Sequence, residues 1–209
     1  MTAEKIISAA AGEIGVKESP AGSNSVKYNT AYYGRKVSGA SYPWCCVFVW
    51  WVFNSSGAKE LFYGGGKTAY CPEAERYYKS KGQWETCGKK GDIVFFDFSK
   101  KGVSEHMGIV ESVNGDGTIT SIEGNTSVTS DDNGGKVMRR TRSLSLVRGF
   151  ARPKYSEIPG KETAENMLAD GIITKENLSN WEKFLSGDYP CPIEYVRTVL
   201  DRYHEKLKG

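Results

Sequence analysis

The sequence predicts an α+β fold, in which N-terminal helices pack against an antiparallel sheet of about five strands and a small all-α module follows. Three observations support this prediction. Residues 44–53 form an almost wholly apolar run, residues 91–152 change to β-branched and aromatic patterns typical of strands, and the sign of the net charge changes after them. The expected organisation is a domain over residues 1–155, a linker over residues 156–160 and a small helical C-terminal domain over residues 161–209.

Apolar residues at helical spacing predict the first helix. Ile6, Ala10 and Ile14 recur along one face, so residues 3–14 are expected to form an amphipathic helix. The further helical expectations are one turn around residues 25–33, within the long loop 15–43, and a helix over residues 72–81.

The apolar run 44–53 predicts a helix in the core. Ser41 as an N-cap and Pro43 near the first turn are typical start signals. A helix of this length is too short to cross a bilayer, which needs about 20 residues. The run is therefore expected to be buried in a globular domain.

The strand region contains one well-defined hairpin. Asn114-Gly115-Asp116-Gly117 is typical of a tight hairpin turn. Antiparallel pairing about this turn is expected to bring residues 123–125 opposite residues 106–108. The expected strands are residues 91–98, 107–113, 118–123, 136–142 and 145–152, with Pro153 ending the sheet.

The charges are unevenly distributed along the 209 residues. The net charge of +3 is too small to indicate nucleic-acid binding, so no nucleic-acid partner is expected. Residues from Ser156 onward carry seven Lys/Arg and ten Asp/Glu, a net charge of −3, which leaves +6 on the first 155 residues. The first module would therefore suit an anionic polymer.

Several binding motifs are incomplete. The five cysteines include no CxxC pair, so neither a disulfide framework nor a zinc site is predicted. Residues 64–68 (GGGKT) lack the glycine that a phosphate loop needs at Leu61. Asn114 and Asp116 are explained by the hairpin turn rather than by a calcium loop. We expect no metal and no cofactor.

Two cysteines lie in the first turn of the core helix. Cys45 and Cys46 would be close to unpaired backbone N–H groups and to the positive end of the helix dipole, which favour thiolate over thiol. This is a suitable place for a nucleophile. Cys71, at the start of the next helix, is expected to be structural.

A nucleophilic cysteine needs a base and a group that orients this base. The chain has two histidines, and His204 lies in a charged segment typical of a solvated helix face. His106 begins a strand, and the hairpin pairing brings Glu123 close to it. His106 and Glu123 are therefore the candidates for these two roles.

These residues lie in motifs that resemble the CHAP domain, the cysteine, histidine-dependent amidohydrolases/peptidases of the papain-like superfamily. The motifs are PWCCVFVW (43–50), GDIVFF (91–96), HMGIV (106–110) and IEGN (122–125). The resemblance covers roughly residues 3–153. It implies Cys45 as nucleophile, His106 as base, Glu123 as the residue that orients the base and Asn125 as a further polar site residue. Cys46 stands where the family usually has a small residue.

The resemblance implies a peptidoglycan hydrolase of the bacteriophage endolysin or autolysin type. Amidase activity on the N-acetylmuramoyl–L-alanine bond is slightly preferred over cleavage within the stem peptide or cross-bridge. Two alternatives stay open: an intracellular papain-like amidase that acts on a small molecule, and a wall-binding module without activity.

Candidate substrate-binding residues come from the loop before the core helix. Asn24, Tyr28, Tyr42 and Trp44 are expected to line the cleft, and Tyr42 is a candidate oxyanion donor. The expected partner is bacterial peptidoglycan, and the C-terminal helices are expected to bind the wall or to mediate homo-oligomerisation. No secretory signal is visible, so the protein is expected to be made in the host cytoplasm and to act at the bacterial cell wall.

Overall fold

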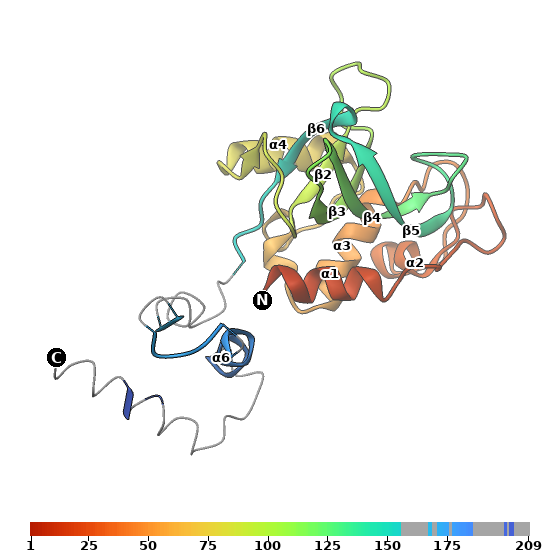
Figure 1. Ribbon diagram of the computed structural model, residues 1–209. Helices are drawn as coiled ribbons and strands as arrows, with labels where there is room; N and C mark the ends of the chain where they lie inside the picture. Colours follow the sequence, from red (N-terminus) through yellow and green to blue (C-terminus); the bar gives the residue numbers. More distant parts are fainter. Residues whose placement is uncertain (156–166, 169–170, 176, 186–198, 200, 203–209) are drawn as a thin grey trace. The chain divides into compact units, whose positions relative to one another are not determined.

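The computed structural model describes residues 1–155, 167–168, 171–175, 177–185, 199 and 201–202 (Figure 1). The chain divides into two units. One contains residues 3–155 with Met1, and the other contains residues 156–209 with Thr2.

The first unit is built on a six-stranded sheet with the order β1-β6-β2-β3-β4-β5, in which all neighbouring strands are antiparallel. The strands are β1 Trp84–Glu85, β2 Ile93–Phe96, β3 His106–Val113, β4 Thr118–Thr126, β5 Lys136–Ser143 and β6 Val147–Ala151. The α+β prediction is confirmed, with one strand more than expected. Strand β1 has only two residues, too few for a periodic signal, and it exists because Trp84 pairs with Ala151 of β6.

Four helices precede the strands: α1 Ala3–Ala11, α2 Lys27–Tyr33, α3 Cys45–Ser55 and α4 Cys71–Ser80. Short 3-10 turns occur at η1 Lys59–Leu61, η2 Tyr63–Gly65 and η3 Leu144–Leu146. The predicted start of α3 was wrong in detail. Its N-cap is Trp44, without a side-chain cap hydrogen bond, so Ser41 does not cap this helix.

Helix α3 packs directly on the sheet, and α1 lies beside it against β3 and β4 (Figure 1). Phe48 and Phe53 of α3 are fully buried with Met107 and Ile109 of β3. Gly124 permits this close approach, because a Cβ atom there would lie 2.5 Å from the Cβ of Phe48. The helix is therefore held rigidly against the strands, as expected from its apolar sequence.

The other face of the sheet has a smaller core. Val94, Phe96, Val110, Ile119 and Phe150 form this cluster. Side chains alternate between the two faces of a strand, so the side chain of His106 lies on this smaller-core side of β3, opposite to Met107. The pairing of Gly108 with Glu123 is found as predicted from the hairpin turn.

The second unit contains helix α6, Leu178–Leu185. Trp181 is buried with Ile172 and Ile173, and Leu178 packs against this cluster. Most of the helical C-terminal domain expected over residues 161–209 falls outside the described residues, as does His204. Within the part of the chain that the structure describes, no helix has the length and apolarity needed to cross a membrane.

Candidate active site

The two adjacent cysteines of α3 have different surroundings. Cys45 lines a pocket of about 420 Å³. Cys46 is fully buried, and its Sγ donates a hydrogen bond of 3.1 Å to the carbonyl oxygen of Thr68. Neighbouring residues of a helix point about 100° apart, so the two thiols cannot share one environment. Cys45 is the thiol with access to the pocket.

His106 and Glu123 are both completely buried and form a direct contact. The Nε2 of His106 lies 3.0 Å from the Oε2 of Glu123. Gly108, the residue paired with Glu123, makes room for this carboxylate, because a Cβ atom at position 108 would lie 2.7 Å from the Cγ of Glu123. The hairpin and the glycine together place the carboxylate beside the imidazole.

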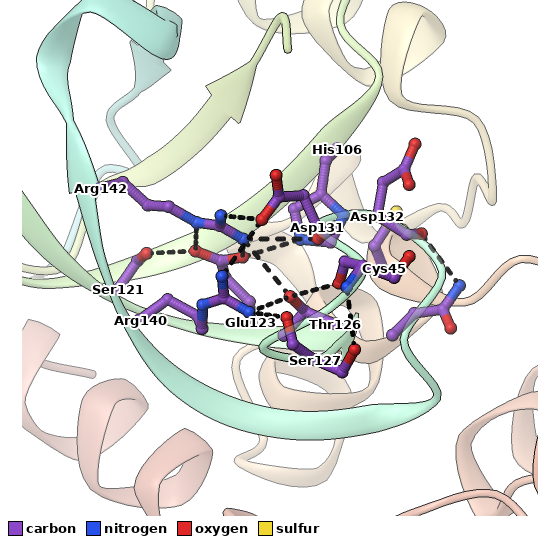
Figure 2. Close-up of polar contacts among 12 residues, drawn as sticks. Cys45, His106, Ser121, Glu123, Thr126, Ser127, Asp131, Asp132, Arg140 and Arg142 are labelled. Atoms are coloured by element: carbon purple, nitrogen blue, oxygen red, sulfur yellow. Dashed lines mark hydrogen bonds and ion pairs between the residues drawn. The ribbon is translucent and has the colours of Figure 1, made fainter.

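Glu123 is held ionised by its neighbours. Burial opposes its charge, but hydrogen bonds with His106 and Arg142 outweigh burial and lower the pKa of Glu123 to about 2. Ser121 donates a further hydrogen bond of 2.6 Å to Oε1. Figure 2 shows these side chains converging on the carboxylate. An ionised Glu123 accepts the Nε2 proton of His106 and so fixes the orientation of the ring.

The other ring nitrogen of His106 is left for the cysteine. Nδ1 is buried and has no hydrogen-bond partner among the described residues. Burial lowers the pKa of His106, but Cys45 and Glu123 outweigh this effect and raise the pKa to about 9. Both neighbours favour the charged form of the imidazole, and a charged imidazole in turn favours a thiolate on Cys45.

Cys71 also contacts the candidate nucleophile. The Sγ atoms of Cys71 and Cys45 are 3.7 Å apart, and both residues line the pocket. This contact, together with burial, raises the pKa of the Cys45 thiol, whereas His106 acts in the opposite direction. The position of this sulfur at the site was not expected from the sequence, and the structural role of Cys71 stays a prediction.

Asn125 is organised differently from the sequence prediction. It is fully buried with φ of 58°, and its side chain binds the loop that follows β4. Nδ2 donates to the carbonyl oxygen of Asp132 at 3.3 Å and to Oδ1 of Asn133 at 3.4 Å, and Oδ1 accepts from the N–H of Gly135 at 3.2 Å. These contacts make Asn125 the residue that shapes the loop, and the loop residues Asp132 and Asn133 line the pocket.

The prediction that Tyr28 and Trp44 bind substrate is contradicted by their burial. Both are fully buried, and their rings pack together with centroids 5.4 Å apart. The Nε1 of Trp44 donates to Glu18 and the hydroxyl of Tyr28 donates to Glu13, at 2.8 and 2.7 Å. These aromatic residues build the core beneath α3, where a substrate cannot reach them.

Asn24 and Tyr42 also lie outside the lining of this pocket. Asn24 is 5% exposed, and its Nδ2 donates to the carbonyl oxygen of Gly39 at 3.1 Å. The ring of Tyr42 packs edge-on against Tyr33 with centroids 5.0 Å apart. Both residues contact other parts of the loop before α3.

Sequence reasoning missed three features of the site: Cys71, Arg142 and the loop residues 131–133. A signal for Arg142 was available. In β5 it pairs with Ile119, on the same face of the sheet as Glu123, so the register of β5 together with strand alternation directs it toward that carboxylate. No local signal indicated that Cys71 and the loop would reach Cys45.

The described residues contain no group of three or more His, Cys, Asp or Glu that could hold a metal ion. The site instead brings together the thiol of Cys45, the imidazole of His106 and the buried carboxylate of Glu123. This is the arrangement that nucleophilic acyl transfer requires, with a nucleophile, a base and a group that orients the base.

Comparisons with known proteins give solved structures and one family model. Two similar solved structures are the crystal structure of Ly7917, with 16% identity and a TM-score of 0.47, and Ly7917 with the hydrolyzing product of MDP, with 17% identity and a TM-score of 0.46. Each alignment covers 73% of this chain, which spans only 62% and 63% of the respective Ly7917 chains. No curated protein sequence matches significantly. The CHAP domain family matches residues 37–125, a segment that contains Cys45, His106, Glu123 and Asn125, and this match supports a papain-like amidohydrolase of the CHAP type.

Proposed function

We propose that this protein is a peptidoglycan hydrolase that cleaves an amide bond by a thiol mechanism. The observation that carries the proposal is the position of His106, which contacts the buried carboxylate of Glu123 and interacts with the pocket-lining Cys45. The match to the CHAP domain supports amidase or peptidase chemistry.

In the proposed reaction the Cys45 thiolate attacks the carbonyl carbon of the scissile amide. The carbon–nitrogen bond then breaks, and His106 gives its proton to the leaving amine. Water, deprotonated by His106, hydrolyses the thioester and restores the thiol. Glu123 remains ionised throughout and stabilises the imidazolium.

The developing oxyanion needs two hydrogen-bond donors. The backbone N–H of Cys45 lies in the first turn of α3, where helical N–H groups have no acceptor within the helix. For the second donor we propose Asn133 in place of Tyr42. Asn133 lines the pocket, and its Oδ1 is occupied by Asn125, which leaves its Nδ2 free to donate. Removing an oxyanion donor typically costs about 10²–10³ in kcat.

For the substrate we propose the bacterial cell wall, with N-acetylmuramoyl–L-alanine amidase activity preferred over stem or cross-bridge endopeptidase activity. The +6 charge of the first 155 residues suits a polymer rich in phosphate and carboxylate groups. The proposed biological role is that of a bacteriophage endolysin. It would be made in the host cytoplasm and would act on the wall, and the second unit would bind the wall or join two copies of the chain.

Digestion of purified peptidoglycan with analysis of the fragments by mass spectrometry tests the proposal. We expect wild type and Cys46→Ser to release fragments and Cys45→Ser to release none, with the new termini identifying the bond. Cys46→Ser is the matched control because it changes the adjacent thiol, which bonds Thr68 instead of lining the pocket. Inactivity of the wild type on walls of several chemotypes would overturn the proposal in favour of a small-molecule amidase or a wall-binding module.

A further inference from the structure

We propose that Arg142 is a positioning residue of the reaction, which acts through Glu123 and connects the catalytic carboxylate to the loop at the pocket. The inference rests on the proposed function for the role of Glu123. Its geometry is independent of which bond is cleaved.

The guanidinium of Arg142 forms two hydrogen bonds with the carboxylate of Glu123. Nε donates to Oε1 at 3.0 Å and Nη2 donates to Oε2 at 2.6 Å. Oε2 is also the atom that contacts His106. Each carboxylate oxygen is thus held by Arg142, and the direction in which Oε2 faces the imidazole is fixed by a planar two-point contact.

The guanidinium is itself fixed on several sides. The Arg142 side chain is 4% exposed, and its Cζ lies 5.0 Å from the ring centroid of Phe98 and 5.6 Å from that of Phe96. The same two rings lie 5.8 and 6.0 Å from the ring of His106. Phe96 and Phe98 therefore pack against both the base and the arginine that holds its carboxylate.

Arg142 also reaches the loop after β4. Nη1 forms an ion pair with Asp131, and Arg140 binds the same Oδ1 atom at 3.1 Å (Figure 2). The next two residues, Asp132 and Asn133, line the pocket. A continuous series of contacts therefore joins the pocket wall to the base: loop, Asp131, Arg142, Glu123, His106.

Burial explains why such a residue is needed. A fully buried carboxylate is costly to keep ionised unless it is paired. Without Arg142, His106 would hold Oε2 and Ser121 would hold Oε1, and of these two partners only His106 can carry a compensating charge. Arg142 supplies both a second charge and a fixed plane, which a lysine in its place could not supply.

The chain offers a matched control on the same strand. Arg139 forms an equivalent two-point ion pair with Glu111, with distances of 2.5 and 2.8 Å, but its side chain is 51% exposed and far less enclosed. Arg139→Met removes the same charge from β5 as Arg142→Met without touching Glu123. Differences between the two variants therefore report the position of the arginine, not the charge of the strand.

The test uses the full-length protein and two readouts. The first is the rate at which iodoacetamide alkylates Cys45, followed by peptide mass spectrometry as a function of pH, which requires no substrate. The second is kcat and KM on peptidoglycan. For Arg142→Met we expect kcat to fall about 10-fold to 100-fold, as is typical when a supporting residue is removed, with a smaller change in KM. We also expect the acid limb of the Cys45 alkylation profile to move to higher pH, because Glu123 without its guanidinium protonates more readily.

Arg142→Lys should lose less kcat than Arg142→Met and should shift the alkylation profile less. Arg139→Met should leave kcat, KM and the alkylation profile as in wild type. In a Glu123→Gln background, Arg142→Met should add little further loss, because Arg142 acts through that carboxylate. A purely structural role predicts a lower melting temperature with unchanged alkylation and pH profiles in the folded protein, and that result would overturn the inference. If peptidoglycan is not cleaved at all, the alkylation profile still tests whether Arg142 acts on Cys45 through Glu123 and His106. The proposed function and the role of Arg142 can therefore be rejected independently.

Discussion

The Sγ atom of Cys71 lies 3.7 Å from the Sγ atom of Cys45, and each of the two residues begins a helix at the edge of one pocket. The contact joins residues 26 positions apart in the chain. It places a second thiol against the proposed nucleophile, where we expect it to change both the acidity and the oxidation of Cys45.

Replacing Cys71 by alanine should make Cys45 more reactive at neutral pH. The contact with Cys71 is the main cause that raises the pKa of the Cys45 thiol, so its removal lowers this pKa and increases the thiolate fraction. The gain is about tenfold for each unit by which the pKa falls, as long as the thiol is mainly protonated. Alkylation of Cys45 by iodoacetamide as a function of pH measures the shift. Cys87→Ser, which changes an exposed thiol, is the control and should alter nothing.

Mild oxidation should join Cys45 to Cys71. Two thiols lose their hydrogens to hydrogen peroxide, which is reduced to two molecules of water, and a disulfide forms that blocks the nucleophile. We expect loss of wall-degrading activity, a mass decrease of two hydrogen atoms in a cross-linked peptide pair, and recovery with dithiothreitol. In Cys71→Ala, oxidation should proceed to sulfinic acid on Cys45 without recovery. Full recovery of the oxidised variant would contradict a role for Cys71 as the partner thiol.

The free energy of unfolding should fall both on acidification and at alkaline pH. The pKa of Glu123 is lowered from 4.5 to about 2, so its charge stabilises the folded state above pH 4.5, and this contribution of order 3 kcal/mol is lost as the pH falls toward 2. The pKa of His106 is raised from 6.5 to about 9, so its charge stabilises below pH 6.5 and this contribution is lost as the pH rises through 9. Thermal unfolding across this range measures both effects.

Glu123→Gln provides the comparison for this pH dependence. It should unfold at a lower temperature than wild type near neutral pH, and it should lose less further stability on acidification. Its His106 should also titrate at a lower pH, which is accessible by NMR because the chain has only two histidines. An acid limb as steep as that of wild type would show that other carboxylates control the acid instability.

Gly108→Ala should displace the carboxylate from the base. The added Cβ would lie 2.7 Å from the Cγ of Glu123, and relieving this overlap costs about 1–3 kcal/mol. We expect a lower melting temperature together with a lower kcat. Gly115→Ala is the control, because a Cβ at that turn position would meet no atom within 4 Å. Equal effects of the two substitutions would mean that the overlap at Gly108 is relieved without moving Glu123.

Much of the fold could be predicted because its signals are local. The apolar composition of residues 44–53 requires burial whatever surrounds them, and α3 is found there. Pairing about the turn at residues 114–117 predicted the approach of residues 123–125 to residues 106–108, and Gly108 pairs with Glu123 beyond a register shift between Val110 and Ser112. The two-residue β1 could not be predicted, since only its pairing with β6 makes it a strand.

The sequence by itself determined the residue types for thiol chemistry and the pairing that brings Glu123 to the strand of His106. Only the tertiary structure decided which cysteine lines the pocket, because this depends on the rotation of α3 about its axis against the sheet. It also decided that Tyr28 and Trp44 are core residues, that Asn125 holds a loop, and that Cys71 and Arg142 reach the site. These contacts join segments that are distant in the sequence, and their geometry is fixed by packing and not by any local pattern.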